Sequence, residues 1–367
     1  MTRGDVINIS AYVLSLTLLL TMTLFLSARV HSQDLQIPDN SQPVELGQVD
    51  WIRNFDEGVK LAKSQNKLLL VLFQEVPGCS TSSGYGKNVL SHPLIVEAIE
   101  TLFVPVAIYN NKGGEDANVL ESFGEPSWNN PVVRIMTPER KELTPRLSGN
   151  YTKSGLVQAM VKALENSNKS VPQYLSLLAQ ELNVRSGTKE RAVFAMHCFW
   201  VGEGKLANVK GVISTEPGFM AGYEVVELEY NSEIISFKDL LKIARANNVA
   251  SHVFTVNGNQ SAAAKEIAGE GQVSELGTFR ADSSPKYYLS RTLYRHVPMT
   301  NLQLARVNAA IGSFQSPDTF LSPRQLELYE YIREHKELDW PDAASATDFN
   351  SSWDQVLSLV GSRISRR

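Results

Sequence analysis

Two cysteines, Cys79 and Cys198, are the only thiols in this chain of 367 residues. They are too few for a disulfide-stapled scaffold, so they could form one structural bridge, remain two unrelated buried thiols, or act as one redox pair. Thiolate is the reactive form of cysteine, and its formation depends on the local environment. The residues around each sulfur therefore have to decide which chemistry it performs.

Cys79 follows a continuous apolar run at 67–74 that predicts a buried strand, and it lies in a Gly- and Ser-rich loop predicted at 75–88. The flanking pattern predicts a sheet covered by helices. The expected helices lie at 55–63, 94–101 and 153–164, and the expected further strands lie at 102–109, 132–136 and 142–147. Loops at the carboxyl ends of such strands expose functional groups, so we expect the Cys79 thiol to be accessible.

The sequence VPGC at 76–79, within this order of elements, resembles the active loop of the thioredoxin fold. Pro131 matches the position of the cis-proline that packs beside the reactive thiol in that fold. Thioredoxins carry a second cysteine three residues after the first, and this chain has Ser82 there. The loop is closer to a thioredoxin-like subgroup with a Val-Pro-Gly-Cys or selenocysteine signature. The resemblance implies a thioredoxin-like α/β domain over 49–166, with an inert Cys79 as the alternative.

Cys198 lies between a predicted strand at 191–196 and a predicted helix at 200–209. The unpaired N–H groups at a helix start favour the thiolate. Neighbouring residues on extended backbone face opposite ways, so we expect His197 to point away from the sulfur and to serve packing or the surface. Strands around 212, at 224–230 and near 253, with helices at 236–246, 262–266 and 284–291, are expected to complete an α+β unit.

The sequence CFW at 198–200, followed by STEPGF at 214–219, EVVELEY at 224–230 and PKYYL at 285–289, resembles the A-type peptide methionine sulfoxide reductase family. The resemblance implies a second domain of that type over 191–335, after a helical connector at 167–190 and before a polar tail at 336–367. In that family a thiolate attacks the sulfoxide sulfur, and a carboxylic acid protonates the oxygen. By resemblance, Cys198 is the nucleophile and Glu224 is the acid.

Aromatic side chains would form the pocket of this second site by the same resemblance. Phe199 and Trp200 would wall the space that receives the S-methyl group of the substrate, although they could also be ordinary core aromatics. Phe219 stands where the family has a tyrosine whose hydroxyl holds the sulfoxide oxygen, and Tyr223 is a candidate replacement. The family's glycines on either side of its motif are His197 and Val201, and its loop around 249–252 is shortened here.

The family clears the sulfenic acid product with a second cysteine near its own C-terminus, and no cysteine follows Cys198 here. Cys79 is the candidate resolving thiol, and an external thiol reductant would reopen the resulting disulfide. The predicted activity is that of a peptide-methionine (S)-S-oxide reductase acting on oxidised methionine in proteins or peptides. The alternatives are a thiol oxidoreductase or peroxidase centred on Cys79, and a catalytically inactive protein that binds such segments.

An apolar stretch at 7–26 follows Arg3 near the N-terminus. With compact residues at 30–32, it predicts a secretory signal over 1–32, and a retained membrane anchor is the alternative. We therefore expect an exported, periplasmic or extracytoplasmic protein, with any membrane contact limited to that anchor.

Composition excludes several other classes of protein. A hydrophobic content of 43% supports packed cores, and a formal net charge of −4 without a dense basic run argues against a nucleic-acid partner. The six histidines are scattered without ligand spacing, so no metal is expected. No phosphate-binding glycine loop is present, and we expect no cofactor.

Overall fold

The computed structural model describes residues 42–184, 187–284, 286–344 and 348–364. The predicted signal over 1–32 lies outside the described residues, and so does its apolar stretch. Within the described ranges, no helix combines the length and the apolarity that crossing a membrane requires.

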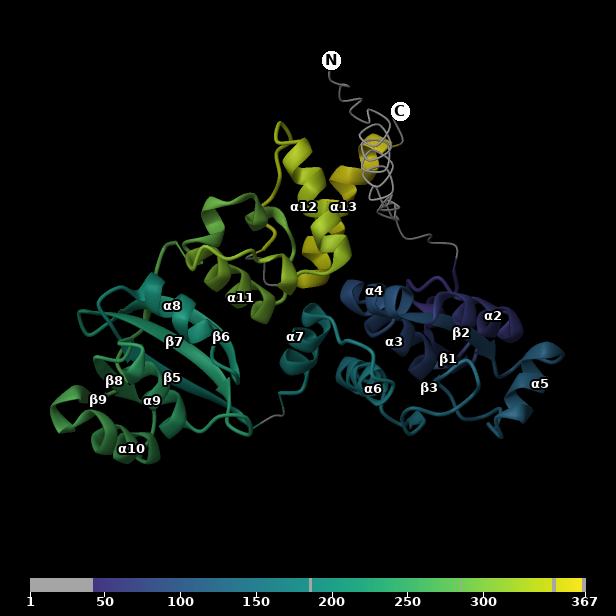
Figure 1. Ribbon diagram of the computed structural model, residues 1–367, viewed down its shortest axis with the longest axis horizontal. Coiled ribbons are helices and arrows are strands. Elements are labelled where there is room, and N and C mark those ends of the chain that lie inside the picture. The colour runs from purple at the N-terminus through teal and green to yellow at the C-terminus, as the bar shows by residue number, and fades with distance from the viewer. Residues whose placement is uncertain (1–41, 185–186, 285, 345–347, 365–367) are drawn as a thin grey trace, which may run out of the picture. The chain divides into compact units, whose positions relative to one another are not determined.

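The first sheet has the strand order β2-β1-β3-β4 and lies in the N-terminal half of the described chain (Figure 1). Its strands are β1 (Leu68–Gln74), β2 (Phe103–Tyr109), β3 (Val132–Met136) and β4 (Leu147–Ser148). β1 pairs in parallel with β2 and antiparallel with β3, and β3 pairs antiparallel with β4. Every residue of β1 is buried, as its unbroken apolar sequence predicts.

Helices cover both faces of this sheet. They are α2 (Phe55–Gln65), α3 (Ser80–Asn88), α4 (Pro93–Leu102), α5 (Glu115–Ser122), α6 (Lys153–Asn166) and α7 (Gln173–Leu182), after the short 3-10 helix η1 (Val44–Leu46). Leu68, Leu70 and Leu72 face the cluster that contains residues of α4, α6 and α7. Leu69, Val71 and Phe73 face the cluster that contains residues of α2 and α5. Alternation along β1 therefore builds two apolar cores.

The second sheet has the order β10-β6-β7-β5-β8-β9. Its strands are β5 (Lys189–Ala195), β6 (Val212–Met220), β7 (Tyr223–Asn231), β8 (His252–Thr255), β9 (Val273–Glu275) and β10 (Arg280–Ala281). All these pairings are antiparallel except the parallel pairing of β8 with β9. A mixed sheet of this kind agrees with the α+β expectation.

The second sheet has one main packed face. Phe194, Val226 and Leu228 pack there with helices α8 (Phe199–Ala207) and α9 (Phe237–Ala246). The other face carries a smaller cluster with Val193 and Phe254. Remaining elements are α10 (Gly258–Ala268), α11 (Asn301–Gly312), α12 (Pro323–Glu334), α13 (Phe349–Ile364) and the 3-10 helices η2 (Glu270–Gln272), η3 (Leu289–Arg291), η4 (Leu293–His296) and η5 (Asp318–Phe320).

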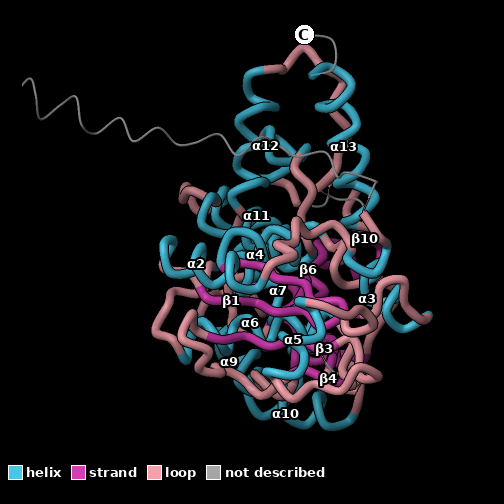
Figure 2. The backbone as a smooth tube through the Cα atoms, turned by 90° about the vertical axis from the view of Figure 1, so that its right-hand side faces the viewer, coloured by secondary structure: helices cyan, strands magenta, loops and turns pink. Residues whose placement is uncertain are grey.

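Several elements differ from the sequence-based expectation. The loop expected at 75–88 is mostly helix α3, because Cys79 caps a helix of small residues that apolar periodicity does not reveal. The strand expected at 142–147 reduces to a bridge between Met136 and Glu142 and to β4. The helix expected at 284–291 is a turn followed by η3. The polar C-terminal tail contains α13, which Figure 2 shows beside α12.

Candidate active site

Cys79 is the N-cap residue of α3, directly after the strand β1 and a short loop. Its backbone is extended (φ −73°, ψ 177°), and its side chain is exposed. The backbone N–H and the hydroxyl of Ser82 lower the pKa of the Cys79 thiol by hydrogen bonding, and the same groups of Thr81 add to this effect. The thiol is thus both accessible and biased toward the thiolate.

Ser82 is fully buried beneath this thiol. Its Oγ lies 3.8 Å from the Cys79 Sγ and 2.5 Å from the Asn130 Oδ1. A hydroxyl has one proton, so Ser82 donates either to Asn130 or to the thiolate, whereas its backbone N–H is always available to the sulfur. The peptide bond between Asn130 and Pro131 is cis, as the thioredoxin resemblance implied. The structure therefore joins the thiol loop and the Pro131 loop through one serine.

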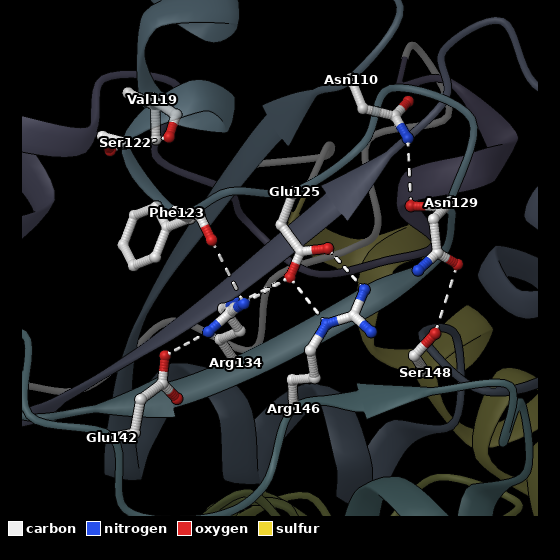
Figure 3. Close-up of polar contacts among 10 residues, drawn as sticks. All are labelled: Asn110, Val119, Ser122, Phe123, Glu125, Asn129, Arg134, Glu142, Arg146 and Ser148. Atoms are coloured by element: carbon white, nitrogen blue, oxygen red, sulfur yellow. Dashed lines mark hydrogen bonds and ion pairs between the residues drawn. The ribbon is translucent and has the colours of Figure 1, made fainter.

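The loop that leads to Pro131 is anchored by a buried carboxylate (Figure 3). The Glu125 side chain is 1% exposed and forms ion pairs with Arg134 at 2.7 Å and Arg146 at 2.5 Å. Burial acts to raise the pKa of Glu125, but the hydrogen bonds from Arg146 and Arg134 outweigh it and lower the pKa. Asn129 in the same loop accepts a hydrogen bond from the Ser148 hydroxyl. These contacts hold the backbone ahead of Pro131.

Two carboxylates contact the loop of Cys79 itself. Glu45 is buried, and its Oε1 accepts hydrogen bonds from the Gly78 N–H at 2.9 Å and from the Ser83 hydroxyl at 3.3 Å. The Glu75 Oε2 accepts the Cys79 N–H at 3.3 Å. These acids lie outside the matched motif, which is why the sequence did not single them out. They fix the backbone of the loop.

Cys198 is the N-cap residue of α8 and follows β5. Its backbone is also extended (φ −137°, ψ 109°), but its side chain is only partly exposed. His197 is exposed while Phe199 is buried, so the histidine lies on the solvent side of this turn, as its extended backbone predicted. The thiol stands at the positive end of the α8 dipole.

Glu224 on β7 lies at the start of the same helix. Its Oε2 accepts a hydrogen bond from the Phe199 N–H at 3.0 Å, which is the N–H group directly after Cys198. The side chain is half-buried. Within the described ranges, its other oxygen, Oε1, takes part in no hydrogen bond or ion pair. The structure thus brings the predicted acid to the residue that follows the predicted nucleophile.

Aromatic rings surround this pair. The Phe199 ring lies 5.3 Å from the Trp200 ring and 5.2 Å from the Phe219 ring, and Phe219 is directly opposite Glu224 in the register of β6 and β7. Trp200 stacks on Tyr287 with centroids 3.7 Å apart, and its Nε1 donates to the Asp282 Oδ2 at 3.0 Å. An aromatic wall of this kind suits an apolar, polarizable group such as a thioether.

Tyr223 does not join this group. Its ring stacks on His252 with centroids 5.1 Å apart and meets Phe254 edge to face at 6.0 Å. Phe254 belongs to the core of the other sheet face, whereas Phe199 packs in the main core. Because successive residues of β7 alternate, Glu224 and Tyr223 point to opposite faces. The role of Tyr223 as a substrate-binding replacement is therefore not supported by its position.

A buried polar cluster supports the aromatic wall from below, and the sequence did not single it out. This cluster, named here the Glu203 cluster, consists of Glu203, Thr215, Lys286 and Asn308. Glu203 on α8 is 0% exposed and pairs with the Lys286 Nζ at 2.5 Å. Lys286 precedes Tyr287, so the cluster ties α8 to the segment that carries the stacked tyrosine. The PKYYL sequence at 285–289 contains Lys286, but the resemblance assigned no role to this lysine or to the rest of the cluster.

Comparison with known proteins separates the chain into the same two parts. A family model described as thioredoxin-like matches residues 50–138. The other part is similar to curated reductases. Peptide methionine sulfoxide reductase MsrA 1 of Nostoc sp. is 29% identical over 139 residues, which cover 28% of this chain and 84% of that protein.

Two further relatives carry related names. Peptide methionine sulfoxide reductase MsrA of Methanococcus maripaludis is 41% identical over 71 residues, which cover 15% of this chain and 45% of that protein. The mitochondrial peptide methionine sulfoxide reductase of Homo sapiens is 30% identical over 148 residues, covering 34% of this chain and 53% of that protein. This chain spans about half the length of these two relatives. Its architecture is thus thioredoxin-like plus methionine sulfoxide reductase-like.

Proposed function

We propose that this protein is an oxidoreductase that reduces methionine S-sulfoxide in peptides or proteins, with Cys198 as the nucleophile. The observation that carries the proposal is the hydrogen bond from the Phe199 N–H to Glu224, directly after Cys198 and inside an aromatic wall. This reaction needs a thiol at a helix start and an acid next to it. It also needs aromatic rings that contact the methyl group of the substrate. The similarity to named reductases supports the same chemistry.

The first chemical step transfers one oxygen atom between two sulfurs. The Cys198 thiolate attacks the sulfoxide sulfur, and Glu224 delivers a proton to the sulfoxide oxygen as the S–O bond weakens. Two electrons pass from the cysteine sulfur to the substrate sulfur. The products are a thioether and a sulfenic acid on Cys198, so thiol plus sulfoxide balances sulfenic acid plus thioether.

The second step would regenerate Cys198. We propose that the Cys79 thiol attacks the sulfenic sulfur, which releases water and forms a disulfide between the two cysteines. An external dithiol then reduces this disulfide and is itself oxidised to a disulfide. The exposure of Cys79 and its lowered pKa support this role, because the attacking sulfur must be ionised. Because both cysteines belong to one chain, each thiol is present at a high effective concentration for the other.

We also propose that the protein works outside the cytoplasm. The apolar stretch at 7–26 after Arg3 supports an export signal or anchor. The test fuses a reporter to the full-length protein and to a version that lacks residues 1–32, and locates each fusion by cell fractionation. Equal retention of both reporters in the cytoplasm would contradict export.

The central experiment measures methionine formed from a peptide sulfoxide by wild type, Cys198→Ser and Cys79→Ser. Without reductant, we expect wild type and Cys79→Ser to release one methionine per chain and Cys198→Ser to release none. With a dithiol reductant, wild type turns over repeatedly. Disulfide mapping after one turnover should join Cys79 to Cys198. Full activity in Cys198→Ser would overturn the nucleophile, and unaltered turnover in Cys79→Ser would overturn the relay alone.

A second candidate function rests on Cys79 by itself. An exposed thiol with a lowered pKa reacts with peroxides or disulfides without any pocket. Consumption of hydrogen peroxide with a thiol reductant would then require Cys79 and be unchanged in Cys198→Ser. The opposite dependence favours the sulfoxide reductase.

A further inference from the structure

An acid and an aromatic wall lie beside Cys198, but Phe219 supplies no hydroxyl to the developing charge on a sulfoxide oxygen. A donor at that position is worth a large part of the rate in comparable reactions, because it stabilises charge that grows in the transition state. Tyr223, the donor that the sequence suggested, faces the other side of the sheet. A different hydroxyl must therefore be sought among the residues around α8.

Tyr288 belongs to a segment that is fixed against α8. The Asn308 Oδ1 accepts hydrogen bonds from the backbone N–H groups of Tyr288 and Leu289, both at 3.1 Å. Asn308 in turn donates to the Glu203 Oε2 at 3.1 Å, and Glu203 holds Lys286. Both sides of the tyrosine are thus bound to the Glu203 cluster. Such a doubly anchored backbone sets the position of a side chain closely.

Packing of α11 on α8 places the Tyr288 ring near the start of α8. A Cβ added to Gly204 would lie 3.7 Å from the Cα of Ala309, and Ala305 packs with Ala207. The two helices are therefore antiparallel, and residue 312 lies one turn closer to the α8 N-terminus than Ala309. A Cβ added to Gly312 would lie 2.6 Å from the Tyr288 ring. The ring consequently sits at the end of α8 that carries Cys198.

The electrostatics of the tyrosine agree with this placement. Burial raises the pKa of Tyr288, and the negative charge of the Cys198 thiolate raises it further. The phenol therefore keeps its proton at neutral pH and remains a donor. In the part of the chain that the structure describes, its hydroxyl makes no hydrogen bond. Its ring meets Tyr287 edge to face with centroids 5.4 Å apart, which joins it to the Trp200 stack.

We propose that Tyr288 is a catalytic residue of this site and that its hydroxyl donates a hydrogen bond to the sulfoxide oxygen. The assignment rests on the proposed function, since it concerns the same reaction at Cys198. Tyr288 holds the oxygen while Glu224 supplies the proton, so the net transfer of oxygen and electrons is unchanged. The hydroxyl replaces, from a different segment, the donor that Phe219 lacks.

The test compares the first turnover of wild type with that of Tyr288→Phe, read as methionine released and as sulfenic acid trapped on Cys198. We expect the rate constant of the Tyr288→Phe variant to fall by roughly 10- to 100-fold, as loss of a transition-state donor does, with little change in KM. Tyr331→Phe is the matched control, since Tyr331 of α12 stacks on His335 and meets Trp340 edge to face. It should retain the wild-type rate.

Gly312→Ala tests the same position without removing the hydroxyl. The new Cβ must displace the Tyr288 ring, so we expect a similar loss of rate. Gly258→Ala in α10 is its control, because an added Cβ there meets nothing within 4 Å. A wild-type rate in Tyr288→Phe, with wild type active, overturns the Tyr288 assignment alone. A wild type that never reduces sulfoxides overturns the proposed function and this assignment together.

Discussion

The two cysteines occupy similar backbone positions but differ in their exposure and in the side chains around them. Each follows a strand, has extended backbone and caps the start of a helix. Cys79 is exposed, and the groups that contact its loop are polar: Ser82, Glu45 and Glu75. Cys198 is partly buried, with aromatic rings and one carboxyl group beside it.

The two sites share the feature that activates a thiol, a helix start, but differ in the side chains that determine which molecule the thiol reacts with. Both sulfurs stand at a helix start, and hydrogen bonds within the loop lower the pKa of Cys79. The exposed Cys79 thiolate on its polar loop is accessible to another protein or to a bulky disulfide. In the proposed reaction, the Cys198 sulfur beside Phe199, Trp200 and Phe219 would meet a small apolar group, and Glu224 would supply the proton. The comparison therefore predicts that substitutions at the two sites affect different steps.

The largest effect should come from Glu224, the proposed acid of the Cys198 site. Glu224→Gln keeps an oxygen for the Phe199 N–H but cannot donate the proton, so we expect the rate of sulfoxide reduction to fall by about 10²-fold. The measurement is the first-turnover rate across pH 6 to 8. Glu229→Gln, on the same strand and paired with Lys189 near the surface, is the control. An unchanged rate in Glu224→Gln would remove the acid from the mechanism and with it the main contrast between the sites.

A smaller effect should follow from thinning the aromatic wall. Trp200→Phe loses the hydrogen bond to Asp282 and part of the stack on Tyr287, so we expect KM for the peptide sulfoxide to rise by roughly 10-fold. The rate at saturation should change less, because the ring binds the substrate and the transition state alike. Trp340→Phe, whose indole donates to the His335 carbonyl, is the control. A loss confined to kcat would assign Trp200 to the chemistry instead.

Much of the fold followed from the sequence because apolar patterning is strong in its main elements. The run at 67–74 predicted β1 almost to the residue, and the helices predicted to start at 55 and 236 begin at Phe55 (α2) and Phe237 (α9). Helices without such patterning were missed. α3 consists largely of Ser and Gly, and α11 buries nearly all of its residues and shows no polar face.

The site was predictable where one motif held its members and unpredictable where tertiary contacts assembled them. Phe199, Trp200 and Glu224 belong to matched sequences, and the structure brings them together. Trp200 meets Asp282 across 82 residues of chain and Glu203 meets Asn308 across 105, and no local pattern links the members of either pair. Tyr223 was chosen because it is next to Glu224 in the sequence. Neighbouring residues of a strand point to opposite faces, so the structure places Tyr223 on the other side of the sheet.

At the Cys79 site, the expected change concerns reactivity toward small reagents. Hydrogen bonds from Ser82 lower the pKa of Cys79, so loss of the hydroxyl in Ser82→Ala moves the pKa upward and leaves less thiolate at pH 7. In a Cys198→Ser background, we expect alkylation at pH 7 to slow by roughly three- to tenfold and the pH profile to move to higher pH. Ser80→Ala, at an exposed helix position, is the control. A profile that does not move would assign the effect to the Ser82 backbone N–H alone.

The smallest effect is expected at Tyr223, and it tests whether the two faces of β7 act separately. The Tyr223 ring stacks on His252, so Tyr223→Phe keeps the stack and removes only an exposed hydroxyl. Exposed substitutions of this kind change stability by at most about 0.5 kcal/mol, and we expect sulfoxide reduction within twofold of wild type. Measurement of kcat and KM beside Tyr288→Phe gives the contrast directly. A large loss in Tyr223→Phe, with Tyr288→Phe unaffected, would mean that substrate approaches Cys198 around the edge of β7 and that the hydroxyl donor comes from the opposite face of the sheet.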